Sequence, residues 1–176
     1  MNSSEILEKL DGWVKTLVDD AKIMRNQIDS DDISRDAQKH IIGGLSYLLR
    51  KVDIIPDYMG GIGVLDDAFV MRVSCRNAVK AGVPDVNDRF KQLAADAELV
   101  DEILDELKER FNLYVNELPE QKIRNRNADT VLDEPGSMEQ FDRELEDEIR
   151  GYKAKPLGKN NKVLRELKSF IKSKIR

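Results

Sequence analysis

The fold depends on one irregular stretch, residues 53–68, which reads DIIPDYMGGIGVLDDA. Pro56 lacks a backbone N–H and disfavours helical geometry at Ile55, so no regular helix continues through this point. The glycines that follow supply turn geometry, and two acidic residues then stand where a new helix begins. This stretch therefore predicts a corner between two helices.

Helical patterning is clear on both sides of the corner. Before it, apolar side chains recur every three or four positions at Ile33, Ala37, Ile41, Leu45 and Leu48. After it, the same spacing continues at Leu65, Ala68, Met71, Cys75 and Ala78. Two adjacent glycines, Gly43 and Gly44, either weaken the first of these helices or let a neighbouring helix approach closely. The pattern predicts a helix, a corner and a second helix.

The rest of the chain is also helical in pattern, and no segment shows the alternation of a strand. One helix is predicted over residues 6–28. A heptad stripe then runs through Phe90, Leu93, Ala97, Val100, Leu104, Leu107, Phe111, Tyr114 and Leu118. Continuous over about 86–118, this stripe corresponds to a helix roughly 50 Å long. It suits packing against the chain's own helices better than a self-associating coil. We therefore expect an all-α bundle of about six helices.

Three regions are predicted along the chain. Residues 1–118 form the main helical module, and residues 119–136 have few periodic apolar positions and are interpreted as a linker. Residues 137–176 form an extension that holds an acidic helix followed by a basic amphipathic helix.

Charge is distributed unevenly along the chain. The net charge is −5. Residues 153–176 hold nine lysines and arginines against one glutamate, a charge of +8, which leaves −13 for residues 1–152. The candidate contact surface consists of Lys162, Arg165, Lys168, Lys172, Lys174 and Arg176. This helix could pair with the acidic helix of the same chain, lie on an anionic membrane, bind a protein partner or contact nucleic acid. The acidic remainder disfavours nucleic acid.

Four aspartates surround the corner: Asp53, Asp57, Asp66 and Asp67. In the structural interpretation, the first two cap or form turns around the proline and the other two favour a helix N-terminus. In the alternative, their carboxylates gather into an all-oxygen site for Mg²⁺ or Ca²⁺, as in a metal-dependent hydrolase. The structural interpretation is favoured because the spacing of a calcium-binding loop is absent. No other cofactor is indicated.

Composition indicates a cytoplasmic protein. The single cysteine, Cys75, cannot form an internal disulfide, as is usual in a reducing compartment. The N-terminus has no secretory pattern, and no uncharged stretch reaches the roughly 20 residues of a spanning helix. The only histidine is His40, so two-histidine metal sites lack their main ingredient.

Around the corner the chain resembles the YkvA-like family, domain of unknown function 1232. The hallmark is a hydrophobic helix, a proline corner and a Gly-x-Leu-Asp-Asp helix start, matched here by Asp53, Ile54, Ile55, Pro56, Asp57, Gly63, Leu65, Asp66 and Asp67. The resemblance covers about residues 40–80, and Gly60-Gly61 stands where a proline is common. It implies an all-helical module without an established activity. Some relatives are treated as membrane-associated, and no catalytic residue carries over.

We therefore expect a small, non-enzymatic interaction or scaffold protein with a protein partner or self-association. The alternatives are a peripheral membrane protein that uses the basic helix, and a metal-dependent hydrolase that uses the four aspartates.

Overall fold

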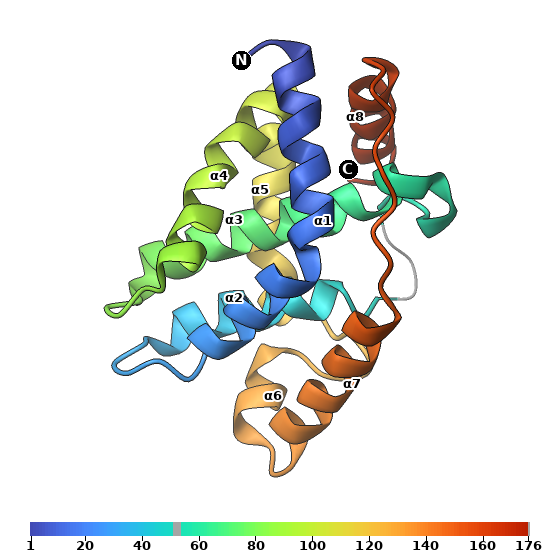
Figure 1. Cartoon of the computed structure of the whole chain (residues 1–176). Coiled ribbons are helices and arrows are strands. Elements are labelled where there is room, and N and C mark those ends of the chain that lie inside the picture. The colour runs from blue at the N-terminus through green and yellow to red at the C-terminus, as the bar shows by residue number, and fades with distance from the viewer. Residues whose placement is uncertain (51–53, 176) are drawn as a thin grey trace.

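Helix α3 (Leu65–Gly82) runs through the middle of the molecule, and α1, α2, α4 and α5 all pack against it (Figure 1). The computed structural model describes residues 1–50 and 54–175. This part of the chain contains α-helices and short 3₁₀ segments and no strand, which confirms the all-α prediction. The α-helices are α1 (Ser3–Gln27), α2 (Arg35–Tyr47), α3, α4 (Asp88–Leu104), α5 (Lys108–Glu117), α6 (Ala128–Asp133), α7 (Ser137–Gly151) and α8 (Lys162–Lys174).

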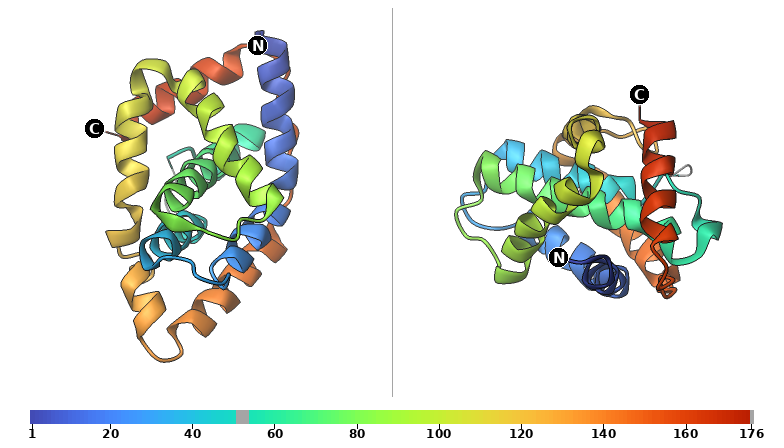
Figure 2. Two further views of the ribbon diagram at one scale, coloured as in Figure 1. Left: turned by 90° about the vertical axis from the view of Figure 1, so that its left-hand side faces the viewer. Right: turned by 90° about the horizontal axis from the view of Figure 1, so that it is seen from above.

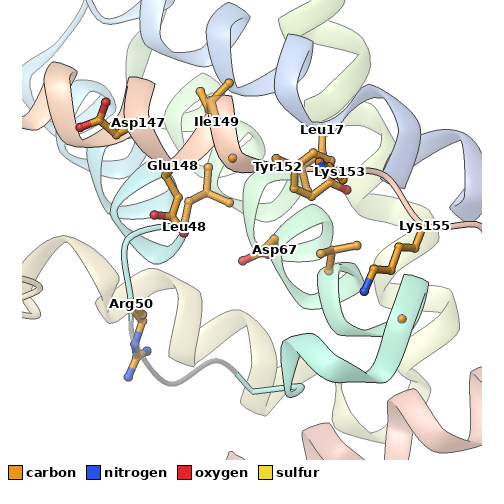
Figure 3. Close-up of a pocket in the computed structure, with 13 residues that line it drawn as sticks. Leu17, Leu48, Arg50, Asp67, Asp147, Glu148, Ile149, Tyr152, Lys153 and Lys155 are labelled. Atoms are coloured by element: carbon orange, nitrogen blue, oxygen red, sulfur yellow. The ribbon is translucent and has the colours of Figure 1, made fainter.

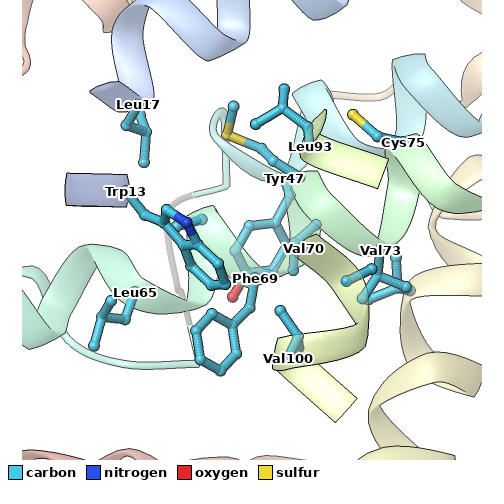
Figure 4. Close-up of a cluster of buried hydrophobic side chains, with 14 of the residues drawn as sticks. Trp13, Leu17, Tyr47, Leu65, Phe69, Val70, Val73, Cys75, Leu93 and Val100 are labelled. Carbon is cyan, nitrogen blue, oxygen red and sulfur yellow. The ribbon is translucent and has the colours of Figure 1, made fainter. Parts of the chain in front are cut away.

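The core forms around the apolar residues of α3. The ring of Phe69 meets the edge of Trp13 at a centroid distance of 5.9 Å and that of Phe111 at 6.3 Å. Figure 4 shows Trp13, Phe69 and Val70 in this cluster, close to Tyr47 from α2. These apolar side chains pack α1, α2 and α5 against α3, so the central helix positions the helices around the predicted corner.

Helix α2 approaches its neighbours closely at the paired glycines: α3 at Gly44 and the 3₁₀ turn η3 (Leu118–Glu120) at Gly43. A Cβ atom built at Gly44 would lie 2.5 Å from Oγ of Ser74, and one at Gly43 would lie 2.9 Å from the backbone nitrogen of Pro119. Neither position has room for a side chain without movement of its neighbour. Of the two alternatives for these glycines, close helix approach is therefore confirmed.

The long helix expected over residues 86–118 is wrong as a single element. It is divided into α4 and α5 by a 3₁₀ turn, η2 (Asp105–Leu107), and Asp105 has a φ of +51°. Leu104 and Phe111, on opposite sides of this turn, are both fully buried. The break lets α4 and α5 lie on α3 in two directions, whereas one straight helix would carry half of the stripe past the core (Figure 2).

The C-terminal part differs from its prediction in two ways. Helix α6 lies inside the segment 119–136 that was interpreted as a linker, and its Val131 is buried. Helix α8 lies at the far end of the molecule from α7 (Figure 1), and no ion pair between described residues joins these two helices. The basic helix therefore does not pair with the acidic helix in this chain. Instead, α8 contacts η2, and its buried side chains are Val163, Leu167 and Ile171.

Candidate functional site

A buried hydrogen-bonded cluster holds the corner between α2 and α3. The hydroxyl of Tyr47, at the end of α2, donates to Oδ2 of Asp66 at 2.6 Å. The backbone N–H of Ile55 donates to the same carboxylate oxygen at 3.2 Å, and the N–H of Ile54 donates to the Tyr47 oxygen at 3.0 Å. Two side chains thus satisfy two backbone donors that a chain leaving a helix would otherwise bury unpaired. We name these four residues the corner cluster.

Burial dominates the electrostatics of the corner cluster. Asp66 and Tyr47 are fully buried. Burial disfavours the charged carboxylate and raises the pKa of Asp66 to about 6, although the hydrogen bonds from Tyr47 and Ile55 act in the opposite direction. Burial and the nearby Asp66 carboxylate likewise raise the pKa of Tyr47 far above its ordinary value. The tyrosine therefore remains a hydrogen-bond donor at every physiological pH.

The other described motif positions of the corner lie in its turn or in the core. Pro56 has a φ of −64° and precedes the 3₁₀ segment η1 (Asp57–Val64), where Gly60 adopts a φ of +71°. Ile55 and Leu65 are fully buried. Gly63 lies in η1 and leads directly into α3.

Asp66 and Asp67 are neighbours at the start of α3, but their surroundings differ. Asp66 belongs to the corner cluster, whereas Asp67 borders a pocket. Asp67 is mostly buried and lines a pocket of about 450 Å³ that also includes Arg50, Tyr152 and Lys155 (Figure 3). Asp53 lies outside the described residues, as does the side chain of Asp57. Within the described part of the chain, no group of three or more His, Cys, Asp or Glu side chains is arranged to hold a metal ion.

A comparison of the sequence with protein-family models finds a match, and it covers the corner. Residues 40–72 match the family of proteins of unknown function DUF1232. The predicted resemblance is thereby confirmed over these residues, and the matched DUF1232 segment includes Tyr47 and the Ile54–Asp66 part of the corner cluster. No curated protein and no solved structure matches the chain significantly.

The DUF1232 segment ends at a buried charge that the sequence analysis missed. Arg72 is fully buried, and its guanidinium lies 3.4 Å from Oδ2 of Asp20, 3.7 Å from Oδ2 of Asp96 and 3.9 Å from the ring centroid of Trp13. Burial lowers the pKa of Arg72 to about 10, and the two carboxylates partly oppose this shift. Arg89 also binds Asp20, at 2.8 Å. This charge cluster ties α1 and α4 to α3.

A signal for the charge cluster was present in the sequence. Asp20 lies three residues after Leu17 and four before Met24, both of which are buried. Arg72 and Asp96 occupy equivalent positions, each three or four residues from buried apolar side chains. Charged residues on the apolar stripes of three helices indicate mutual pairing in the core, since an unpaired buried charge is costly.

Cys75 lies next to this cluster, on the next turn of α3. Its thiol is fully buried, and burial raises its pKa well above the ordinary value. The group therefore stays protonated and packs as a small apolar side chain.

The basic residues of the C-terminus form an exposed face of α8. Lys162, Arg165, Lys172 and Lys174 are exposed and Lys168 is partly buried, whereas Arg176 lies outside the described residues. In the described part of the chain, the ion pair on this face is internal to the helix, between Lys162 and Glu166 at 3.3 Å. We call these five described residues the basic C-terminal surface. None of the described helices combines the length and the apolar character needed to cross a membrane.

Proposed function

We propose that the protein is a small helical interaction protein without a catalytic role, and that its basic C-terminal surface binds an acidic protein surface. The observation that carries this proposal is the solvent exposure of most cations on α8. Arg165, Lys168 and Lys172 border a hollow that also holds Asp105 and Glu106 of η2. Four of the five cations are exposed, and the ion pair recorded for them in the described chain stays within the helix. Such a surface offers several charges to one partner, and paired charges across an interface give specificity and fast association.

The corner cluster supports the non-catalytic part of the same proposal. The Asp66 carboxylate is buried and accepts hydrogen bonds from Tyr47 and Ile55. An aspartate engaged in this way supports the geometry of α2 and α3 and offers little to a substrate. We therefore assign the DUF1232 segment an architectural role, and no observation favours the metal-dependent hydrolase.

The charge balance supports a protein partner over nucleic acid. Residues 1–152 carry a charge of −13, which repels a phosphate backbone everywhere except near α8. An acidic protein, including a second copy of this chain, needs to contact α8 alone. We place this interaction in the cytoplasm, where a chain with one cysteine needs no disulfide.

Charge reversal on α8 tests the proposal. The full-length variant Lys162→Glu/Arg165→Glu/Lys172→Glu is compared with a matched control, Lys91→Glu/Lys108→Glu/Arg110→Glu, whose three residues are exposed on α4 and α5. Binding to immobilised polyglutamate at several salt concentrations is the measurement, and sedimentation of the chain alone reports self-association. We expect the α8 variant to lose binding and the control to keep it. Equal binding by the two variants would contradict the proposal.

A peripheral membrane protein is the second candidate, and the amphipathic character of α8 favours it. Buried Val163, Leu167 and Ile171 lie on the face opposite Arg165, Lys168 and Lys172 of the basic C-terminal surface. A helix of this kind binds anionic bilayers when its apolar face is free to enter the headgroup region. In this structure that face is docked on the chain itself, so membrane binding requires the helix to move.

A further inference from the structure

The chain after α7 forms an arm, residues 152–175, that crosses the molecule before it ends in α8. Figures 1 and 2 show its extended part running past α1 and the corner. Two hydrogen bonds hold this part in the described structure. The hydroxyl of Tyr152 donates to the carbonyl oxygen of Val14 at 2.8 Å, and the N–H of Leu157 donates to Oδ1 of Asp11 at 3.0 Å. Both partners lie on α1.

The arm also lies directly on a glycine of the corner. A Cβ atom built at Gly61 would lie 2.8 Å from the carbonyl oxygen of Lys155 and 2.9 Å from that of Pro156. Both obstacles are backbone atoms, which cannot turn aside as the end of a flexible side chain can. The arm therefore reaches its place because residue 61 has no side chain. This is one of the two glycines at the point where the resemblance leads one to expect a proline.

The extended part of the arm is loosely packed on both sides. One side opens on the 450 Å³ pocket that contains Asp67 and Lys155. The other opens on a pocket of about 620 Å³ between the N-terminal half of α1 and residues Pro156–Lys159. Beyond it, α8 is held through its apolar face, and no described ion pair links its basic residues to another helix. Segments with few contacts open at lower free energy than the core does.

We propose that the arm is a releasable anchor for an anionic lipid surface, and that it closes against the DUF1232 corner because Gly61 leaves room for its backbone. This inference rests on the second candidate function above. In the closed state α8 buries Val163, Leu167 and Ile171 against the chain, so the side of the helix that faces solvent is polar and largely cationic. In the open state the same side chains, together with the partly buried Leu164 and Phe170, form an apolar face opposite Arg165, Lys168 and Lys172. A helix with these two faces binds an anionic bilayer, because its apolar face is buried in the headgroup region and its cations attract the anionic lipids.

Gly61→Ala should open the arm selectively, because the three atoms nearest to the added methyl group all belong to the arm, in Lys155, Pro156 and Leu157. Gly151→Ala is the matched control, since a Cβ atom there meets nothing within 4 Å. Trypsin cleavage after Lys153 and Lys159 in the full-length proteins measures arm release. Far-UV circular dichroism during heating measures the stability of the helical core. We expect Gly61→Ala to be cleaved about tenfold faster than the control, with the core still folded.

Vesicle flotation identifies the partner of the open arm. The probes are vesicles of phosphatidylcholine with and without phosphatidylserine. Because apparent affinity rises with the fraction of open molecules, Gly61→Ala should bind the phosphatidylserine vesicles about tenfold more strongly than wild type and Gly151→Ala do. Adding Leu167→Asp to Gly61→Ala should abolish this gain while the arm stays cleavable, since the charge spoils the apolar face.

Three results would overturn the inference at different points. Unchanged cleavage of Gly61→Ala, or cleavage accompanied by loss of the helical core, contradicts the role of Gly61 in admitting the arm. An open arm without increased vesicle binding contradicts a lipid partner and leaves the acidic protein partner of the proposed function to its own test. Equal binding by Gly61→Ala with and without Leu167→Asp contradicts insertion of the apolar face.

Discussion

The hydroxyl oxygen of Tyr47 lies 2.6 Å from Oδ2 of Asp66, and this buried contact joins the last turn of α2 to the first turn of α3. The two residues are 19 positions apart and lie on either side of the proline corner. Backbone donors of Ile54 and Ile55 complete the arrangement. The corner of the DUF1232 segment is therefore fixed by two side chains that satisfy the backbone between the helices.

Removal of the tyrosine hydroxyl should destabilise the fold. Tyr47→Phe takes the donor from Asp66 and the acceptor from the buried N–H of Ile54. An unsatisfied buried group costs about 1 to 3 kcal/mol, so we expect the free energy of unfolding in urea to fall by that amount. Tyr152→Phe is the control, because its hydroxyl donates to one carbonyl of a half-buried site. A larger loss in the control would contradict the importance of the corner cluster.

The pH dependence of stability should report the buried Asp66. Its pKa in the folded state, about 6, lies above the ordinary value of 3.8. The folded protein therefore holds this proton more tightly than the unfolded chain does. The resulting stability is fully present below pH 3.8 and is lost as pH rises through 6.

Asp66→Asn should remove that contribution, which is on the order of 3 kcal/mol for a pKa raised from 3.8 to about 6. The measurement is the difference in unfolding free energy between wild type and variant at several pH values from 4 to 7. Asp147→Asn, on the exposed side of α7, serves as the control and should follow wild type. If wild type and Asp66→Asn follow parallel curves, the carboxyl does not titrate as its burial requires.

Loss of the buried cation in the core should be costly. Arg72→Met leaves Asp20 and Asp96 in the core with fewer partners, and it removes the contact with Trp13. Breaking a buried ion pair from one side costs about 3 to 5 kcal/mol, because the remaining charge stays buried. Arg150→Met removes two ion pairs on the exposed surface of α7 and should change the unfolding free energy by less than about 0.5 kcal/mol. Similar values for the two variants would contradict this assignment.

The close approach of α2 and α3 should make alanine unfavourable at position 44. Alanine normally stabilises a helix by about 1 kcal/mol relative to glycine. Gly44→Ala should instead destabilise the protein by about 1 to 3 kcal/mol, because the new methyl group meets Ser74. Gly12→Ala, in α1, meets nothing within 4 Å and should be neutral or stabilising.

A second substitution separates the clash from other effects of alanine at position 44. In a Ser74→Gly background the obstructing side chain is gone, so Gly44→Ala should cost little there. An equal cost in both backgrounds would show that Ser74 is not the obstacle.

Apolar spacing was sufficient to predict most of the helices, because each helix must bury one face. It did not predict the break at Asp105, since the heptad stripe continues through Leu104, Leu107 and Phe111 without interruption. The direction in which a stripe turns depends on what it packs against, and α3 supplies that surface only in three dimensions.

The site could be predicted in part. The proline corner and the helix start at Asp66 follow from local chemistry, whereas the contact of Asp66 with Tyr47 requires α2 and α3 to be placed. The position of the arm was likewise hidden, because its contact with Gly61 joins residues far apart in the chain. Attraction between the acidic and basic helices suggested a pairing of α7 with α8, but the apolar face of α8 is docked elsewhere.

The most direct test of the account is the urea unfolding midpoint of Asp66→Ala at pH 5. At this pH the wild-type carboxyl, with a pKa of about 6, is largely protonated, so the substitution removes a hydrogen-bond acceptor rather than a buried charge. The account predicts a lower midpoint with an unchanged dependence on urea, equivalent to a loss of about 1 to 3 kcal/mol. It also predicts that the folded variant binds polyglutamate through α8 as wild type does. An unchanged midpoint together with lost binding would contradict the architectural role of the DUF1232 segment.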